Sequence, residues 1–215
     1  MNKMGDFFNE KKRKKVNLPP NSPRMIAQIS VFDDMDQMTE AEVQHMLPLV
    51  NEQRREEALR YKHLFGQFCC LKSWLMLNEL LTPLGINDLE MRKNQHGKPY
   101  LLHYPEMHFN LSHCKNGIAV VIGIAPVGID IESFHRENEA LVRRTMNDME
   151  IGIIQSSPNP TAAFTKLWTQ KEAVLKLRGT GIVNDLYGVL DDKGYCLESY
   201  IDEEKQYAWS VAYTN

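Results

Sequence analysis

The spacing of hydrophobic residues along the chain predicts two long helices. In the first, apolar side chains recur at spacings of four, three and four, at Leu64, Phe68, Leu71 and Leu75, which aligns them on one side of a helix. We expect this helix to run from about residue 51 to residue 81, with a kink at Gly66 and an end at Thr82-Pro83. A second helix is predicted over residues 161–178, because Pro160 precedes it and Gly179 follows it. Proline at the start and glycine just past the end is the usual asymmetry of helix termini.

Shorter apolar segments predict strands around these helices. They cover residues 108–112, 118–123 and 127–132, and a last strand near the end of the chain shows Tyr207, Trp209, Val211 and Tyr213 in alternation with smaller or polar residues. Order is predicted to begin at Met25, with a further strand-like segment that includes Ile26, Gln28, Ser30 and Phe32. Thr39 is a candidate N-cap for a short helix that follows.

This order of elements is typical of an α+β protein. We expect two similar α/β halves in a pseudo-two-fold arrangement, meeting near residue 125. The predicted division is a flexible basic N-terminal tail at residues 1–24, an N-terminal half at residues 25–125 and a C-terminal half at residues 126–215.

Composition indicates an ordinary soluble protein, with 43% hydrophobic and 25% charged residues among 215. No apolar run reaches the roughly 18 residues that a membrane span needs, and the first ten residues lack the apolar segment of a secretory signal. None of the four cysteines forms a C-x-x-C pair, which argues against a zinc site. We therefore expect a reduced, cytoplasmic protein with no membrane contact.

Charge is divided unevenly along the chain. Residues 1–24 carry a net charge of +5, so the remainder carries −8 of the total of −3. An acidic body argues against nucleic acid as a partner, because phosphate neutralisation needs a basic face. The basic run Lys11–Lys15 has two interpretations, a solvated tail whose charges repel one another or a weak contact for an acidic partner.

The segment Val127–Glu132 carries the first candidate site. Side chains alternate along a strand, so Asp130 and Glu132 point to one face while Ile129 and Ile131 point to the core. Two adjacent carboxylates repel each other unless a cation lies between them, and oxygen ligands of this kind suit Mg²⁺. The alternative is an ordinary solvated strand face, since acidic-x-acidic triplets also arise by chance.

The predicted helix over residues 161–178 carries a second cluster. Glu172 and Lys176 are four residues apart, so they share a helix face and can pair. They border the apolar stripe formed by Phe164, Leu167, Trp168 and Leu175. One interpretation is a surface ion pair; the other is a third carboxylate for a metal and a lysine for a phosphate.

The third cluster precedes both. Gly97 and Pro99 mark a tight turn that holds Lys98 at the surface. Further on, Asn110, Ser112 and His113 end a predicted strand and offer an amide, a hydroxyl and an imidazole as donors to a phosphate. A structural role for the histidine is the alternative. No G-x-S-x-G, Walker A or G-x-G-x-x-G motif is present, which argues against a Ser–His hydrolase and the common nucleotide loops.

Taken in order, these clusters resemble the signature of 4′-phosphopantetheinyl transferases of the surfactin-synthetase-activating (Sfp) type. The matching segments are Gly97–Pro99, Phe109–His113, Gly128–Glu132 and Trp168–Lys176, and Gln53–Arg60 is similar to the family's N-terminal half. The chain departs from the family in the apolar run Leu64–Cys70, where many relatives carry charged residues, and in its basic tail.

The resemblance implies a monomer that transfers the phosphopantetheine arm of coenzyme A to a serine of an apo acyl or peptidyl carrier protein and releases 3′,5′-ADP. It implies that Mg²⁺, or Mn²⁺ in its place, is bound by Asp130, Glu132 and Glu172. It assigns contacts with coenzyme A to Lys98, Asn110, Ser112, His113, Lys176, Lys93 and Arg60. Glu172, directly or through a water on the metal, is the implied base, with Asp130 and Lys176 completing the catalytic set.

Two other functions stay open at this stage. One is a binding module for coenzyme A or a carrier protein that has lost catalysis, against which the complete set of acidic residues and Lys176 argues. The other is a metal-dependent phosphate-ester hydrolase, which would release product without a carrier.

Overall fold

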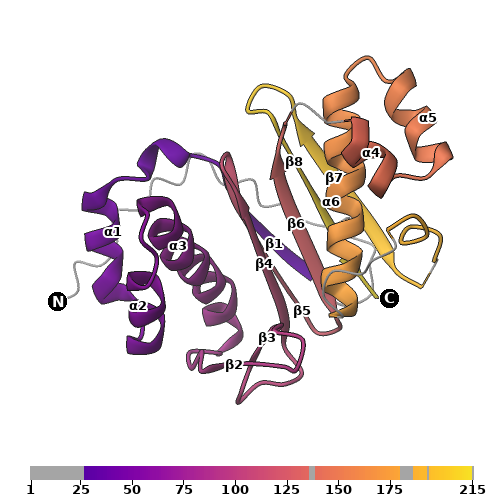
Figure 1. The fold of residues 1–215 in the computed structure, drawn as a ribbon. Coiled ribbons are helices and arrows are strands. Elements are labelled where there is room, and N and C mark those ends of the chain that lie inside the picture. The colour runs from indigo at the N-terminus through magenta and orange to yellow at the C-terminus, as the bar shows by residue number, and fades with distance from the viewer. Residues whose placement is uncertain (1–26, 136–138, 180–185, 193, 215) are drawn as a thin grey trace.

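The structure is a computed structural model that describes residues 27–135, 139–179, 186–192 and 194–214. Its elements form four layers, with helices on one side, two three-stranded sheets in the middle and further helices on the other side (Figure 1). Helices and strands thus both contribute, which confirms an α+β fold. The predicted tail and Met25–Ile26 lie outside the described residues.

The first sheet is antiparallel, in the order β1-β5-β4. Strand β1 spans Ala27–Phe32, β4 spans His108–Cys114 and β5 spans Gly117–Gly123. The central strand β5 is buried along its whole length, with one side toward the outer helices and the other toward the second sheet. The two strands predicted here, 108–112 and 118–123, are therefore confirmed to within two residues.

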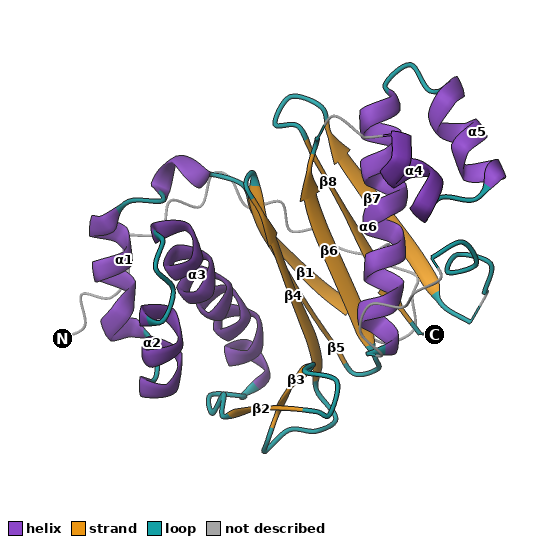
Figure 2. Cartoon of the chain, viewed as in Figure 1, coloured by secondary structure: helices purple, strands orange, loops and turns teal. Residues whose placement is uncertain are grey.

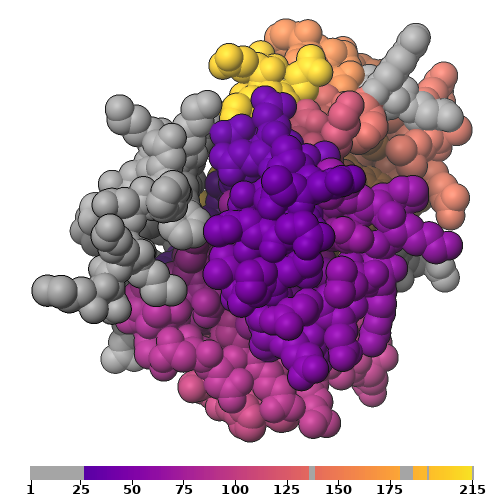
Figure 3. Space-filling model, turned by 90° about the vertical axis from the view of Figure 1, so that its left-hand side faces the viewer, coloured from indigo at the N-terminus to yellow at the C-terminus, as the bar shows by residue number. Residues whose placement is uncertain are grey.

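The outer helices of this region are α1 (Glu40–Met46), α2 (Glu52–Leu59) and α3 (Leu64–Leu81). In Figure 3, which faces this side of the molecule, indigo side chains from the early part of the chain cover the centre of the surface. Thr39 caps α1 as predicted, its hydroxyl accepting from the Glu42 amide. Short 3₁₀ turns at Met35–Gln37, Leu47–Leu49 and Thr82–Leu84 join or end the helices.

The prediction of one helix from about residue 51 to 81 was wrong. The chain leaves helical geometry between Arg60, which caps α2, and His63, which caps α3. The Tyr61 ring then lies against Gly66, where any Cβ would overlap it, and Gln67 donates a hydrogen bond to the Tyr61 carbonyl. Gly66 therefore admits a neighbouring ring inside a continuous helix and does not kink it. No glycine or proline marks the actual break.

The second sheet is also antiparallel, in the order β6-β8-β7. Strand β6 spans Val127–Ser133, β7 spans Cys196–Asp202 and β8 spans Tyr207–Tyr213. The two predicted strands at 127–132 and 207–213 are confirmed, and β7 was not predicted. The apolar residues of β6 and β8 meet those of β1 and β5 in a core between the two sheets, which includes Ile129 and Ile131 as expected.

Helix α6 (Pro160–Arg178) covers the outer face of this second sheet (Figure 2). Asn159 caps its first turn, and Gly179 ends it in the left-handed conformation at φ 67°. Both ends agree with the prediction. Helices α4 (Glu139–Thr145) and α5 (Asp148–Ser156) pack beside α6 and were not predicted.

A short hairpin of β2 (Met91–Lys93) and β3 (Pro99–Leu101) projects below the first sheet. Strand β5 ends at Gly123 and β6 begins at Val127. The division into two halves near residue 125 and their relation by a pseudo-two-fold axis stay predictions. Within the described ranges, no helix combines the length and the apolar character needed to cross a membrane.

Candidate active site

The two sheets meet along β4 and β6, and the bonds between them come from side chains. The Asn110 carboxamide oxygen accepts a hydrogen bond from the Ile129 amide at 3.0 Å, and the Ser112 hydroxyl accepts one from the Ile131 amide at 3.3 Å. Both side chains are buried. Two polar residues of β4 therefore satisfy backbone donors at the edge of β6. These bonds fix the position of β6 along β4, and with it the position of Asp130.

Helix α6 lies unusually close to β6 because Gly128 has no side chain. A Cβ at this position would overlap with the Ala173 carbonyl oxygen and the Leu177 amide nitrogen, both of which are backbone atoms. Glycine in a strand often marks such a close backbone approach. Here it brings the face of α6 that carries Glu172 and Lys176 against the strand that carries Asp130 and Glu132.

Asp130, Lys176 and Ser112 form the centre of the site. The Lys176 ammonium lies 2.6 Å from Asp130 Oδ1 and 3.0 Å from the Ser112 hydroxyl, which itself donates to Asp130 Oδ1 at 2.8 Å. Asp130 is 3% exposed, and its second oxygen, Oδ2, is buried with no hydrogen-bond partner. A buried carboxylate oxygen without a partner is costly. A ligand that bound Oδ2 would remove this cost.

The structure decides between the two interpretations of Glu172 and Lys176 as far as the ion pair is concerned. Lys176 pairs with Asp130 across the layer boundary, and a surface pair with Glu172, which the helical spacing allowed, is not the one formed. The reason is the close approach at Gly128, which brings the Asp130 carboxylate within reach of the helix.

The remaining carboxylates, Glu132 and Glu172, are half-buried near Asp130. Burial, with the Asp130 charge as the second cause, raises the pKa of Glu132 to about 7. The same two causes, in the same order, raise the pKa of Glu172. Two half-buried carboxylates with raised pKa beside the buried Asp130 form a site that favours either protons or an added cation.

Lys98 contacts the end of α6 beside this centre, and His113 follows Ser112 on β4. The Lys98 ammonium is half-buried against the end of α6, at 2.6 Å from the Lys176 carbonyl oxygen and 3.2 Å from that of Val127, and burial lowers its pKa. His113 is an exposed residue whose ring meets Phe65 edge-on at 5.6 Å. Surrounding protein atoms, and then the Lys176 charge, lower the pKa of His113.

Arg60 and Lys93 are not brought to this centre. The Arg60 guanidinium is exposed and lies 3.8 Å from Glu56 on its own helix, and Lys93 is exposed at the end of β2. Their contacts with coenzyme A stay predictions. The structure thus brings together Asp130, Glu132, Glu172, Lys176, Ser112, Asn110 and His113, with Lys98 at the C-terminal end of α6.

The donors present fit a hard divalent cation. Within the described ranges, no three His, Cys, Asp or Glu side chains are already gathered closely enough to hold a metal ion. However, the free Asp130 Oδ2 and the two carboxylates with raised pKa are all oxygen donors that a divalent cation would stabilise. The Lys176 ammonium at Asp130 Oδ1 shows that this position already accepts a positive charge.

Sequence reasoning missed three residues that shape this site. Gly128 was quoted as part of a motif without a role, and its value as the contact point of α6 depends on a layer packing that no local pattern reveals. Lys171 and Glu150 form a buried ion pair at 2.7 Å beside α6. The available signal for this pair was the position of Lys171 directly before Glu172 in the matching segment Trp168–Lys176.

Comparison with known proteins gives consistent matches. Residues 126–214 match the model of the 4′-phosphopantetheinyl transferase superfamily. The chain is 29% identical over 160 residues to the 4′-phosphopantetheinyl transferase psf-1 of Bacillus pumilus, a match that covers 72% of this chain and 68% of the relative. It is 23% identical over 150 residues to 4′-phosphopantetheinyl transferase Sfp of Bacillus subtilis (strain 168), with 67% of each chain covered.

A more distant organism provides a third relative. The L-aminoadipate-semialdehyde dehydrogenase-phosphopantetheinyl transferase of Saccharomyces cerevisiae is 25% identical over 162 residues, which cover 70% of this chain and 60% of the relative. The family match includes β6 and α6, the elements that carry the three carboxylates and Lys176. These matches confirm the resemblance: residues 126–214 match the superfamily model, and the Bacillus 4′-phosphopantetheinyl transferases are homologues of this chain.

Proposed function

We propose that this protein transfers the 4′-phosphopantetheine group of coenzyme A to a serine hydroxyl of an apo acyl or peptidyl carrier protein. The observation that carries the proposal is the ion pair of Lys176 with Asp130 between α6 and β6, beside Glu132 and Glu172, whose pKa values are raised by burial and then by the Asp130 charge. The match of residues 126–214 to the superfamily model and the names of the relatives support the same reaction.

The bond changes define what the site has to supply. The serine oxygen forms a bond to the β-phosphorus of coenzyme A, and the bond from that phosphorus to the bridging oxygen breaks. The electron pair of the broken bond leaves with 3′,5′-ADP, and the serine proton goes to a base. Such a transfer depends on positioning and charge neutralisation more than on covalent help from the protein.

Glu172 is the proposed base for the serine proton. Its pKa is raised by burial and by Asp130, so its carboxylate binds a proton more readily than a solvent-exposed glutamate. A base whose pKa lies closer to the working pH is more effective in proton transfer. Its half-buried position on α6 leaves one side open for the carrier serine.

Cationic and neutral donors around Asp130 are proposed to bind the phosphates. The Lys176 ammonium lies at the centre of the site and donates a hydrogen bond to the Ser112 hydroxyl. His113 lies at the exposed edge of β4. Lys98 is committed to carbonyl groups of α6 and β6, so a phosphate contact requires its ammonium to exchange one of these acceptors.

Asp130, Glu132 and Glu172 are the residues that would hold Mg²⁺, or Mn²⁺ in its place. The ion supplies positive charge that neutralises the phosphate oxygens of coenzyme A and stabilises the negative charge that develops during transfer. Lys176 would then exchange its contact with Asp130 Oδ1 for a phosphate oxygen, since both positions accept the same ammonium.

The test is the intact mass of an apo carrier protein incubated with this protein, coenzyme A and Mg²⁺. The expected result is the addition of one phosphopantetheine group to the carrier. A parallel reaction that contains EDTA should show no addition. Asp130→Asn should lower the transfer rate by at least about a hundredfold, the usual scale for loss of one charge-stabilising group. Asp36→Asn, which changes an exposed aspartate of the first 3₁₀ turn, is the matched control.

Two results would contradict the proposal. A folded protein that binds coenzyme A but modifies no carrier would indicate a binding module. Release of 3′,5′-ADP without a carrier would indicate a hydrolase.

A further inference from the structure

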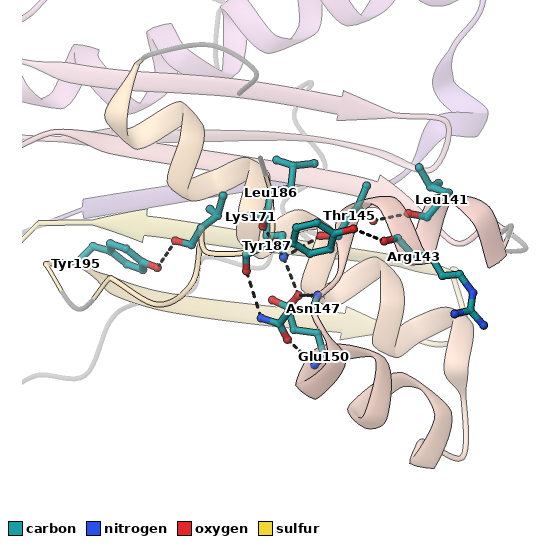
Figure 4. Close-up of polar contacts among 10 residues, drawn as sticks. Leu141, Arg143, Thr145, Asn147, Glu150, Lys171, Leu186, Tyr187 and Tyr195 are labelled. Carbon is teal, nitrogen blue, oxygen red and sulfur yellow. Dashed lines mark hydrogen bonds and ion pairs between the residues drawn. The ribbon is translucent and has the colours of Figure 1, made fainter. Parts of the chain in front are cut away.

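A buried lysine lies next to Glu172 and points away from the proposed active site. Lys171 is 1% exposed, and its ammonium has three acceptors: the Thr145 carbonyl at 2.9 Å, the Leu186 carbonyl at 2.7 Å and Glu150 Oε2 at 2.7 Å (Figure 4). An ammonium has three N–H donors. Every donor of this buried charge is therefore satisfied, and each acceptor comes from a different segment of the chain.

The Glu150 carboxylate connects this lysine to the corner between α4 and α5. Glu150 is 5% exposed, and Oε2 also accepts from the Asn147 amide at 2.8 Å, while the Asn147 side chain accepts from the Glu150 amide. This reciprocal arrangement is a capping box at the start of α5. Thr145, the last residue of α4, offers one of the end carbonyls that lack a partner within the helix.

The same corner is joined to the segment after α6. The side-chain carboxamide of Asn147 donates through Nδ2 to the Tyr187 carbonyl at 3.2 Å, and the Tyr187 hydroxyl donates to the Arg143 carbonyl (Figure 4). Leu186, which accepts from Lys171, is the neighbour of Tyr187. The α4–α5 corner and this segment thus form one hydrogen-bonded unit around the Lys171 ammonium.

Helix α6 is consequently fixed from two directions. On one side, Lys176 binds Asp130 of β6 and Gly128 permits close contact. On the other, Lys171 binds the α4–α5 corner. A rotation of α6 about its axis that moved Glu172 away from Asp130 would draw Lys171 out of its three contacts, because consecutive residues of a helix turn together.

We propose that Lys171 is a positioning residue, whose buried contacts with Glu150, Thr145 and Leu186 set the rotation of α6 and so the placement of Glu172 and Lys176. This proposal rests on the proposed transfer function for its kinetic consequences. Its structural consequence, the holding of α6, does not depend on which reaction the site performs.

A pair of variants separates positioning from general stability. Lys171→Met removes the ammonium and leaves the Glu150 carboxylate buried without its partner, which destabilises strongly. Adding Glu150→Gln removes that uncompensated charge and keeps an oxygen for the Asn147 amide. Because replacing both partners of a buried pair costs far less than removing one, the double variant should regain most of the thermal midpoint lost by the single variant.

The expected result is that stability returns in the double variant and activity does not. We expect kcat to stay at least about tenfold below that of the unchanged protein, the scale seen when partners that orient a site residue are removed, with KM for coenzyme A changed by less. Amide hydrogen exchange over residues 172–177 should be faster in the double variant at matched global stability. Lys166→Met is the control, because it makes the same substitution at an exposed position of the same helix.

Recovery of kcat together with the thermal midpoint would overturn the proposal, and so would a lower kcat with unchanged exchange in α6. If the double variant does not fold, Glu150→Gln alone, measured well below its thermal midpoint, tests the same kinetic and exchange effects. If the unchanged protein modifies no carrier, the proposed function fails, and the exchange of α6 then decides the positioning proposal without it.

Discussion

The molecule contains two regions in which a long helix covers a three-stranded antiparallel sheet, and they differ in what the helix buries. Helix α3 turns toward its sheet a side of almost entirely apolar residues, with Phe68, Leu71 and Leu77 fully buried. Helix α6 buries Thr169 and Lys171 beside its apolar residues and brings Glu172 and Lys176 to its sheet. The same architecture thus provides a hydrophobic base in one region and a polar site in the other.

The approach of helix to sheet explains this difference. The side chains of α3 and β5 fill the space between them, as in an ordinary core. At α6 the backbone meets β6 directly at Gly128, and the Lys176 side chain of α6 reaches the short Asp130 side chain of β6. In this molecule the polar site therefore goes with a closer approach of helix to strand than the hydrophobic packing of α3 on β5. Four changes to the chain test this comparison.

The largest effect is expected at Gly128. Gly128→Val places a side chain against backbone atoms of Ala173 and Leu177, which cannot move without shifting α6. Overpacking typically costs about 1–3 kcal/mol and occasionally more; here backbone atoms are in the way, so we expect the upper end of this range, and transfer should be lost because α6 and its Glu172 shift away from β6. Chemical denaturation and the carrier mass assay measure the two effects. A stable and active Gly128→Val variant would show that close contact is unnecessary.

Leu71→Ala tests the hydrophobic region in the same way. Leu71 is fully buried in the core between α3 and β5, so the cavity should lower the free energy of unfolding by about 2–5 kcal/mol. Below its thermal midpoint, the variant should keep the kcat of the unchanged protein. A large drop in kcat under conditions where the variant is folded would contradict a purely structural role for α3.

The third prediction concerns pH and metal. Because the pKa of Glu132 is raised from 4.5 to about 7 in the folded state, the folded protein binds this proton more tightly than the unfolded chain. Its contribution to stability is therefore complete below pH 4.5 and is lost as the pH rises to about 7. In metal-free solution, Glu132→Gln should reduce this fall in the thermal midpoint.

Added Mg²⁺ should raise the thermal midpoint at neutral pH, since a ligand that binds the folded state stabilises it. The gain should be smaller for Glu132→Gln. An equal Mg²⁺ effect in both proteins would remove Glu132 from the proposed metal ligands.

The smallest effect is expected at Gly152, an exposed position of α5. Gly152 has open space where a Cβ would lie, so Gly152→Ala should stabilise the protein by about 0.5–1 kcal/mol through helix propensity alone. Thermal denaturation measures the gain, and transfer should not change. Destabilisation by this substitution would show that α5 packs more tightly than the structure indicates.

The strongest periodic patterns predicted the elements of the site correctly. The alternation at Ile129–Glu132 placed two carboxylates on one face of β6, and the proline and glycine flanking α6 marked its ends. Most of the site residues assigned from the family motifs lie around the Asp130–Lys176 pair, although their roles stay predictions.

Other features could not be read from local sequence because they depend on contacts between distant segments. The break before α3 is stabilised by Tyr61 against Gly66, with no glycine or proline to announce it. The partner of Lys176 is set by the distance between layers, and no helical spacing reports that distance. Helices α4 and α5 are short, and their corner depends on Lys171, whose burial a sequence pattern does not show.

The meeting of β4 and β6 has a mechanical consequence. Within the described strands, each sheet has its own backbone ladder, and no backbone pairing joins β4 to β6. Asn110 and Ser112 make the hydrogen bonds across this boundary with their side chains. A pulling force that separates the two sheets therefore meets a few side-chain bonds and an apolar contact, and we expect the molecule to yield there before either sheet unravels.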